Sequence, residues 1–315
     1  MVTMLRGLVP ALCMLAAVLP APVAIAPAPP PAPKVSTPPL AVPRSLEFFY
    51  DLYSFRTDGG GTSVVAAIAV PVARLRRERK GNRVRYRFDV RFVLADTASR
   101  AVFHTEDSVF VSTPRALSRQ HLLHTYVEVE APPSAGTLQR IVVTDASRPG
   151  VGQLYTTPFP VPDYSGDDLM LSDLAFGLPD ASGGWTRRGV TLALLPTSQF
   201  PESSFDIYYE IYNLPAGNSY ETEISIQPLD DDGNDDPDER AVRALFSGES
   251  AARADGSLAE LRRVASALDK GSYRFTITVR DMVTGQSAAR SRLVQVRGWR
   301  RGTTMVAAMP RGLGR

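Results

Sequence analysis

The chain has 315 residues, a formal net charge of +2 and a single cysteine, Cys13. A charge this close to neutral creates no field that would attract nucleic acid, so a nucleic-acid partner is excluded. The length suffices for one large or two ordinary hydrophobic cores. If the segment carrying Cys13 is removed, no disulfide can form and the folded state depends on burial alone.

Residues 1–26 predict a secretory signal peptide. Arg6 supplies the positive n-region, an apolar stretch follows, and small residues precede position 27. Pro27 leaves the cleavage site open, and a retained membrane anchor is the alternative. Prolines interrupt the stretch, whereas a spanning helix needs about 20 uninterrupted apolar residues. We therefore expect a secreted, periplasmic or cell-envelope protein whose mature chain has no transmembrane span.

The segments that flank the globular part have their own composition. Residues 27–43 are rich in proline and predict a linker, which is either an extended polyproline II spacer or a disordered leader. Residues 298–315 are basic and show no hydrophobic periodicity, which predicts a disordered tail.

Between these flanks the period-two pattern of β-strands dominates. Residues 83–93, RVRYRFDVRFV, alternate apolar and charged side chains without a break. The same alternation recurs at 125–130, 204–214, 220–226 and 273–281, and turn residues separate the runs. Strands with one apolar and one polar face are typical of antiparallel sheets. The sequence predicts an all-β protein with two tandem immunoglobulin- or fibronectin-like antiparallel β-sandwich domains, at 44–163 and 164–297.

An internal similarity supports this division. Residues 141–161 and 277–296 each contain a β run that ends in aspartate, a turn with glycine and a second polar strand. Asp145 and Asp281 are expected to accept backbone hydrogen bonds at these turns. Chance similarity between two β-hairpins is the alternative.

The second half carries a further structural motif. Leu268, Gly271 and Tyr273 match a tyrosine corner, in which the phenol hydroxyl bonds to backbone a few residues upstream. The first half lacks the hydroxyl at the corresponding place. Residues 257–271 remain ambiguous between a short helix, with Ser257 and Glu260 in capping-box spacing, and an irregular strand.

Several segments resemble the β-rich region of bacterial GWxTD-domain proteins. These are FFYDLYSFRTDGGGTSVV, YRFDVRFVLAD, PFPVPDYSGDDLMLSDLAFG and YYEIYNL, spread over about residues 47–297. The namesake motif is absent, because Gly184-Trp185 and Gly298-Trp299 are not followed by the required threonine and aspartate. The resemblance implies an exported envelope protein without an established chemistry.

The acidic loop at 228–239 is the first candidate binding site. When Gly233 is set at position 6 of a calcium loop, Asp230, Asp232 and Glu239 occupy positions 3, 5 and 12. Pro228 then occupies position 1, where its side chain cannot ligate. The loop is therefore either a partial calcium site or a solvated turn, and no other cofactor is expected.

The polar face of 83–93 is the second candidate. Its four arginines could bind an anionic polymer or an acidic glycan; they are Arg83, Arg85, Arg87 and Arg91. Alternatively they form cross-strand ion pairs, for which Glu128 and Glu130 have matching alternation.

Catalytic signatures are scarce. His121 and His124 form an H-x-x-H pair without a third histidine nearby, since His104 lies on another segment. We expect a non-enzymatic binding or structural module of the cell envelope that contacts a protein partner through edge strands and an outer face carrying Tyr208 and Tyr212. These two tyrosines either stack on sugar rings or, as we favour, pack against the neighbouring domain or strand. The alternatives are a carbohydrate- or anionic-polymer-binding protein and, more remotely, a glycosidase, whose paired acids need no local motif.

Overall fold

The computed structural model describes residues 44–178, 184–200, 204–265, 268–296 and 306–307. The expected signal peptide, the expected proline-rich linker before residue 44 and most of the expected basic tail lie outside these residues. The all-β prediction is confirmed, because the described residues form strands and two 3-10 helices, η1 (Val72–Arg74) and η2 (Thr197–Gln199), with no α-helix among them. No helix capable of crossing a membrane occurs in this described part.

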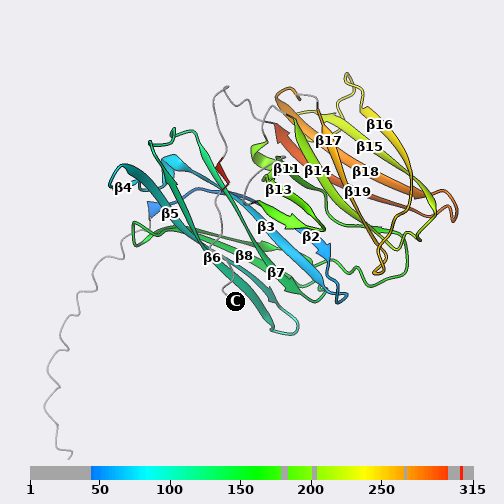
Figure 1. The fold of residues 1–315 in the computed structure, drawn as a ribbon, viewed down its shortest axis with the longest axis horizontal. Helices are drawn as coiled ribbons and strands as arrows, with labels where there is room; N and C mark the ends of the chain where they lie inside the picture. The colour runs from blue at the N-terminus through cyan, green and yellow to red at the C-terminus, as the bar shows by residue number, and fades with distance from the viewer. Residues whose placement is uncertain (1–43, 179–183, 201–203, 266–267, 297–305, 308–315) are drawn as a thin grey trace, which may run out of the picture. The chain divides into compact units, whose positions relative to one another are not determined.

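The first half of the described chain forms two sheets around one hydrophobic cluster (Figure 1). One sheet has the order β2-β3-β7, and the short β20 pairs in parallel with β7. The other has the order β1-β9-β8-β5-β4, and β6 also pairs with β5. Their bounds are β1 Arg44–Ser45, β2 Phe49–Arg56, β3 Thr62–Pro71, β4 Glu78–Lys80, β5 Arg83–Asp96, β6 Val102–Thr113, β7 Leu122–Ala131, β8 Thr137–Asp145, β9 Val151–Pro158 and β20 Val306–Ala307.

The second half forms two further sheets. One has the order β10-β14-β11-β13-β12 with β17 paired to β14, and the other has the order β16-β15-β18-β19. Their bounds are β10 Met170–Leu171, β11 Ala175–Leu178, β12 Trp185–Arg187, β13 Val190–Leu194, β14 Phe205–Tyr212, β15 Ser219–Leu229, β16 Val242–Glu249, β17 Ser257–Val264, β18 Gly271–Asp281 and β19 Ser287–Val296.

The two halves repeat one strand order. A three-strand group, β2-β3-β7 or β11-β14-β17, is matched in each half by a four-strand group, β6-β5-β8-β9 or β16-β15-β18-β19. Two antiparallel sheets of this kind define an immunoglobulin-like sandwich. The contacts within Pro43–Arg315 nevertheless make it one compact unit, so the division at residues 163 and 164 stays a prediction.

The turn aspartates also repeat. The Asp145 carboxylate accepts a hydrogen bond from the Ser147 amide at 2.9 Å, and the Asp281 carboxylate accepts one from the Val283 amide at 2.8 Å. Both turns contain a glycine at positive φ, Gly150 at 81° and Gly285 at 77°, a conformation that costs glycine little. The two hairpins that resemble each other in sequence therefore share their turn chemistry.

The sheet that contains β3 and the sheet that contains β14, called here the middle sheets, are buried on both faces, which the alternation pattern did not predict. All residues of β3 from 62 to 70 are buried. Val64 belongs to the hydrophobic cluster of the first half, and Val65 belongs to a second hydrophobic cluster, made mostly of residues of the second half. The whole of β14 is buried as well. An exposed face with Tyr208 and Tyr212 is therefore wrong, and the favoured packing against a neighbouring strand is confirmed, because both tyrosines are fully buried where this sheet packs against β2.

The ambiguous segment at 257–271 contains a strand, and the helical alternative is wrong. β17 pairs in antiparallel register with β14 from Tyr212 opposite Ser257 to Phe205 opposite Val264. Glu260 does not cap a helix. Its carboxylate accepts a hydrogen bond from Tyr220 and pairs with Arg262 at 2.6 Å. Pairing with a buried neighbouring strand has overridden the weak helical periodicity.

Candidate functional site

The arginine face of β5 points outward, as the alternation indicates, and it is engaged by neighbouring strands. Arg91 pairs with Glu106 of β6 at 2.8 Å, and Arg87 lies 3.7 Å from Glu78 of β4. Arg83 donates to the Ser112 hydroxyl at 2.9 Å. These contacts use part of the charge that an anionic polymer would need.

The contact made by Arg85 and the positions of the expected acidic partners differ from those that the sequence predicted. The Arg85 guanidinium lies 5.2 Å from the centre of the Phe110 ring. Glu128 and Glu130 do not lie opposite the arginines, because β7 belongs to the other sheet and pairs with β3. Period-two patterning shows which way a side chain points but not which strand lies beside it. Anion binding by this face stays a prediction.

The acidic loop is held by its own hydrogen bonds. The Asp230 carboxylate accepts from the amides of Asp232 at 3.0 Å and Asn234 at 2.8 Å, while Asp235 pairs with Arg274. Asp232 and Glu239 are exposed. In the described ranges no three acidic, histidine or cysteine side chains are grouped so that they could hold a metal ion. Calcium binding here remains a sequence prediction.

The tyrosine corner has a direct structural counterpart. The Tyr273 hydroxyl donates to the Asp269 carbonyl at 3.0 Å, four residues upstream. A side chain at Gly271 would lie against the Tyr273 ring at 3.6 Å, and Leu268 packs against the second hydrophobic cluster. This contact fixes the entry into β18 and is structural.

The histidines do not converge. His121 is 5% exposed and His124 is 3% exposed, whereas His104 is exposed on β6. Burial lowers the pKa of His124 to about 4. A histidine with so low a pKa stays neutral near pH 7.

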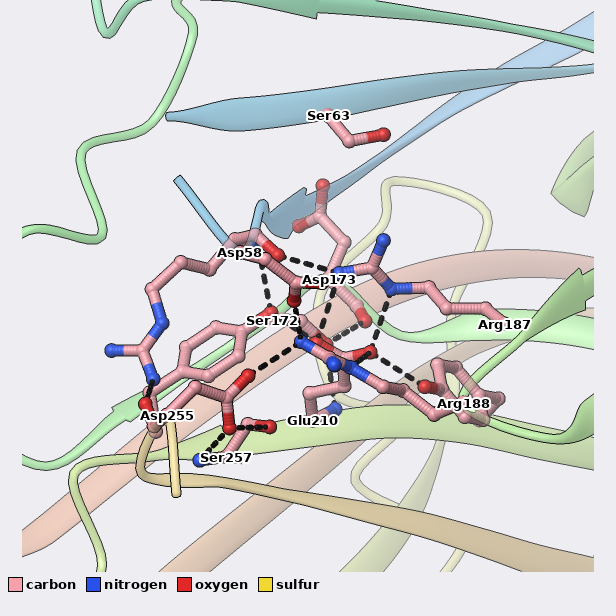
Figure 2. Close-up of polar contacts among 12 residues, drawn as sticks. Asp58, Ser63, Ser172, Asp173, Arg187, Arg188, Glu210, Asp255 and Ser257 are labelled. Atoms are coloured by element: carbon pink, nitrogen blue, oxygen red, sulfur yellow. Dashed lines mark hydrogen bonds and ion pairs between the residues drawn. The ribbon is translucent and has the colours of Figure 1, made fainter. Parts of the chain in front are cut away.

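The largest feature that sequence reasoning missed is a buried ionic cluster centred on Glu210 of β14 (Figure 2). Arg187 donates to the two Glu210 carboxylate oxygens, through Nε at 2.6 Å and Nη2 at 3.1 Å. The hydroxyls of Tyr208 and Tyr212 donate to the same carboxylate at 2.6 and 2.8 Å. The side chain of Glu210 is completely buried.

A tight hairpin supplies the second arginine of the cluster. Arg188 and Gly189 join β12 to β13 with φ values of 49° and 84°, the positive values of a two-residue type I′ turn. From this turn Arg188 donates to Asp58 at 2.6 Å and to Asp255 at 2.7 Å (Figure 2). The cluster therefore joins the loop after β2 and the loop before β17 to the centre of β14.

The ionisable groups of the cluster bond to one another. Burial by itself would lower the pKa of Arg187, but the hydrogen bond and the charge of Glu210 raise it above its ordinary value. Burial, followed by the charge of Glu210, raises the pKa of Tyr208. The cations stay protonated and the phenols neutral, so we assign this cluster to holding the middle sheets in register.

An apolar groove lies at the open side of the second sandwich. It has a volume of about 400 Å³ and is lined by residues of β15, β16 and β17. Its floor includes Ile224 and Ile226, and its rim includes Val242 and Phe246. We call it the β16–β17 groove.

Both strands beside this groove have an open backbone edge. Among the described residues β16 pairs with β15 alone and β17 with β14 alone. Every residue of β16 except Gly248 is exposed. Val242 remains 65% exposed although it faces the same side as the buried Ile226 opposite it. Such an edge strand is a template for pairing with another chain.

Comparisons with known proteins identify no family. No family model and no curated relative matches the chain. Among solved structures it is similar to red sea bream transglutaminase, at 10% identity and a TM-score of 0.21, over 79% of this chain and 31% of that one. It is also similar to a Bacteroides uniformis β-glucuronidase, at 10% identity and a TM-score of 0.25, over 75% of this chain and 26% of that one. The chain thus spans less than a third of either protein.

Proposed function

We propose that the protein is an exported, non-enzymatic binding module of the cell envelope that holds a partner protein by strand addition at the β16–β17 groove. The observation that carries the proposal is the edge strand β16, exposed at every residue except Gly248, beside an apolar groove. The partner contributes an extended segment whose backbone pairs with β16 and whose alternate apolar side chains enter the groove.

The chemistry of the groove favours an extended peptide. Val242, Ala244 and Phe246 lie on the same face of β16, opposite Ile226, Ile224 and Thr222 of β15. They are spaced two residues apart, which is the repeat of a strand laid beside them. The Arg262 guanidinium lies 4.8 Å from the centre of the Phe246 ring at the rim of the groove.

The experiment measures binding of the full chain to immobilised peptides of β16 length that alternate apolar and polar residues. Val242→Glu places a charge on the groove side of the strand, and Leu245→Glu is the matched control on the opposite side. The two native side chains are 65% and 63% exposed, so the two substitutions should affect stability alike. We expect Val242→Glu to abolish binding and Leu245→Glu to preserve it.

Hydrogen exchange supplies the second readout. Added peptide should slow exchange at the amides of β16, because they gain backbone partners in a strand-addition complex. Equal peptide binding by the Val242→Glu and wild-type proteins would overturn the proposal. Unchanged exchange across β16 in the complex would also overturn it.

A glycosidase would need two carboxyl groups in one cleft, one of them as a proton donor. Asp51 and Asp173 do line one cleft. Each is committed to arginine: Asp51 to Arg292, and Asp173 to Arg290. Carboxylates held in ion pairs of this kind give no support to hydrolysis in that cleft.

A further inference from the structure

The cleft that contains these aspartates lies away from the β16–β17 groove. Its volume is about 570 Å³, and β2, β8, β9 and β19 contribute to its lining. Its lining includes Tyr50, Gln139, Phe159, Asp173 and Arg290. We call it the Gln139 cleft.

Gln139 is the feature that points to a ligand. It is only 1% exposed, and its Nε2 donates to the Tyr50 hydroxyl at 2.8 Å and to the Thr157 hydroxyl at 2.5 Å. Its Oε1 is buried and has no hydrogen-bond partner. Buried polar atoms are normally paired, because an unpaired one loses its interaction with water without compensation. The two hydroxyls hold Nε2, and Gln139 is one of the residues that line the cleft.

Both aromatic and polar side chains line the cleft. Tyr50 and Phe159 are half-buried and line the same cleft. The Tyr50 ring is backed by Tyr155, at a centroid distance of 5.7 Å. A rigid, partly open aromatic ring is a surface on which an apolar ring face packs.

The charges in the cleft balance. Arg290 Nε donates to Asp173 at 2.7 Å, and Arg292 pairs with Asp51. Two guanidinium groups thus face two carboxylates, which leaves no excess charge to attract an ionic ligand. The ion pairs still present hydrogen-bonding atoms to a neutral polar molecule.

We propose that the Gln139 cleft binds a neutral sugar ring. A hydroxyl of the sugar donates to Gln139 Oε1, and the C–H face of the ring packs on Tyr50 and Phe159. A polyhydroxyl ligand fits because each of its hydroxyls can accept a hydrogen bond from an arginine and donate one to an aspartate. This site is separate from the strand-addition groove and does not depend on it.

The test is calorimetric titration of the full chain with neutral hexasaccharides of glucose, xylose and mannose, and with a uronic-acid oligosaccharide for comparison. Gln139→Met keeps the side-chain volume and removes the amide. Gln153→Met is the matched control, because Gln153 lies on β9 outside the cleft and accepts from the Ser45 hydroxyl. We expect a neutral oligosaccharide to bind, Gln139→Met to weaken it about tenfold and Gln153→Met to leave it unchanged.

A second variant, which leaves the amide in place, guards against misfolding of Gln139→Met. Phe159→Ala removes one wall without touching the amide and should weaken the same sugar, while circular dichroism checks the fold. Absence of binding to all neutral sugars would overturn the proposal, as would preference for the uronic acid. Equal affinity in the wild-type, Gln139→Met and Phe159→Ala proteins would overturn it too.

Discussion

Removing the carboxylate of Glu210 should be one of the most damaging single changes to this fold. Glu210→Ala leaves the Arg187 guanidinium, whose side chain is 13% exposed, without its counter-charge. It also removes the acceptor of the Tyr208 and Tyr212 hydroxyls. Breaking one partner out of a buried ion pair typically costs about 3–5 kcal/mol. We expect a loss near 4 kcal/mol, because Arg187 keeps its bond to the Arg56 carbonyl at 2.6 Å.

Equilibrium urea unfolding of the full chain measures this loss. The matched control is Glu106→Ala, which breaks the exposed pair with Arg91 and should cost at most about 1 kcal/mol. The double variant Arg187→Met/Glu210→Leu should be more stable than Glu210→Leu alone, because it leaves no unpaired charge. A Glu210→Ala loss as small as that of Glu106→Ala would refute the structural role of the cluster.

Two further predictions concern single side chains. His124 has a folded pKa of about 4, below its ordinary value of 6.5, so the unfolded chain binds its proton first and stability falls as the pH drops through this window. The wild-type protein should lose about 2 kcal/mol more than His124→Leu between about pH 7 and pH 5; urea titrations at both pH values check this, and parallel losses would contradict it. Tyr273→Phe removes the bond to the Asp269 carbonyl and should lower the unfolding free energy by about 1 kcal/mol. Thermal melting compares it with Tyr155→Phe, and equal melting temperatures would rule out an energetic contribution from the corner.

The strand content and the local turns could be predicted from the sequence because they depend on neighbouring residues. In β5, Tyr86, Phe88, Val90 and Phe92 are buried on one face, as their alternation indicates. Alternate residues of β15 and β18 are likewise buried on one face. Asp145 and Asp281 each bond to an amide two residues later, so a short stretch contains this turn contact, although each also accepts from a residue more than 60 positions away.

The candidate sites could be predicted less well from the sequence. The uninterrupted apolar run at 64–70 is typical of a strand covered on both faces, but the prediction rested on alternating segments and missed it. Glu210 and Arg187 carry no comparable signal: they are 23 residues apart, and each sits in a pattern that also fits an exposed strand. Gln139 shares the inward face of β8 with Ile141 and Val143, but only the approach of Tyr50, 89 residues earlier, shows which groups enclose it.

The sequence by itself determined that this chain forms antiparallel β-strands, where the regularly alternating ones run and how its two aspartate turns close. Only the tertiary structure decided which sheet faces meet, which turned an expected outer tyrosine face into a buried ionic layer and left β16 as an open edge. The physical reason is that alternation records the direction of each side chain relative to its own strand. What covers that side chain depends on strands distant in the sequence, whose pairing no local pattern encodes.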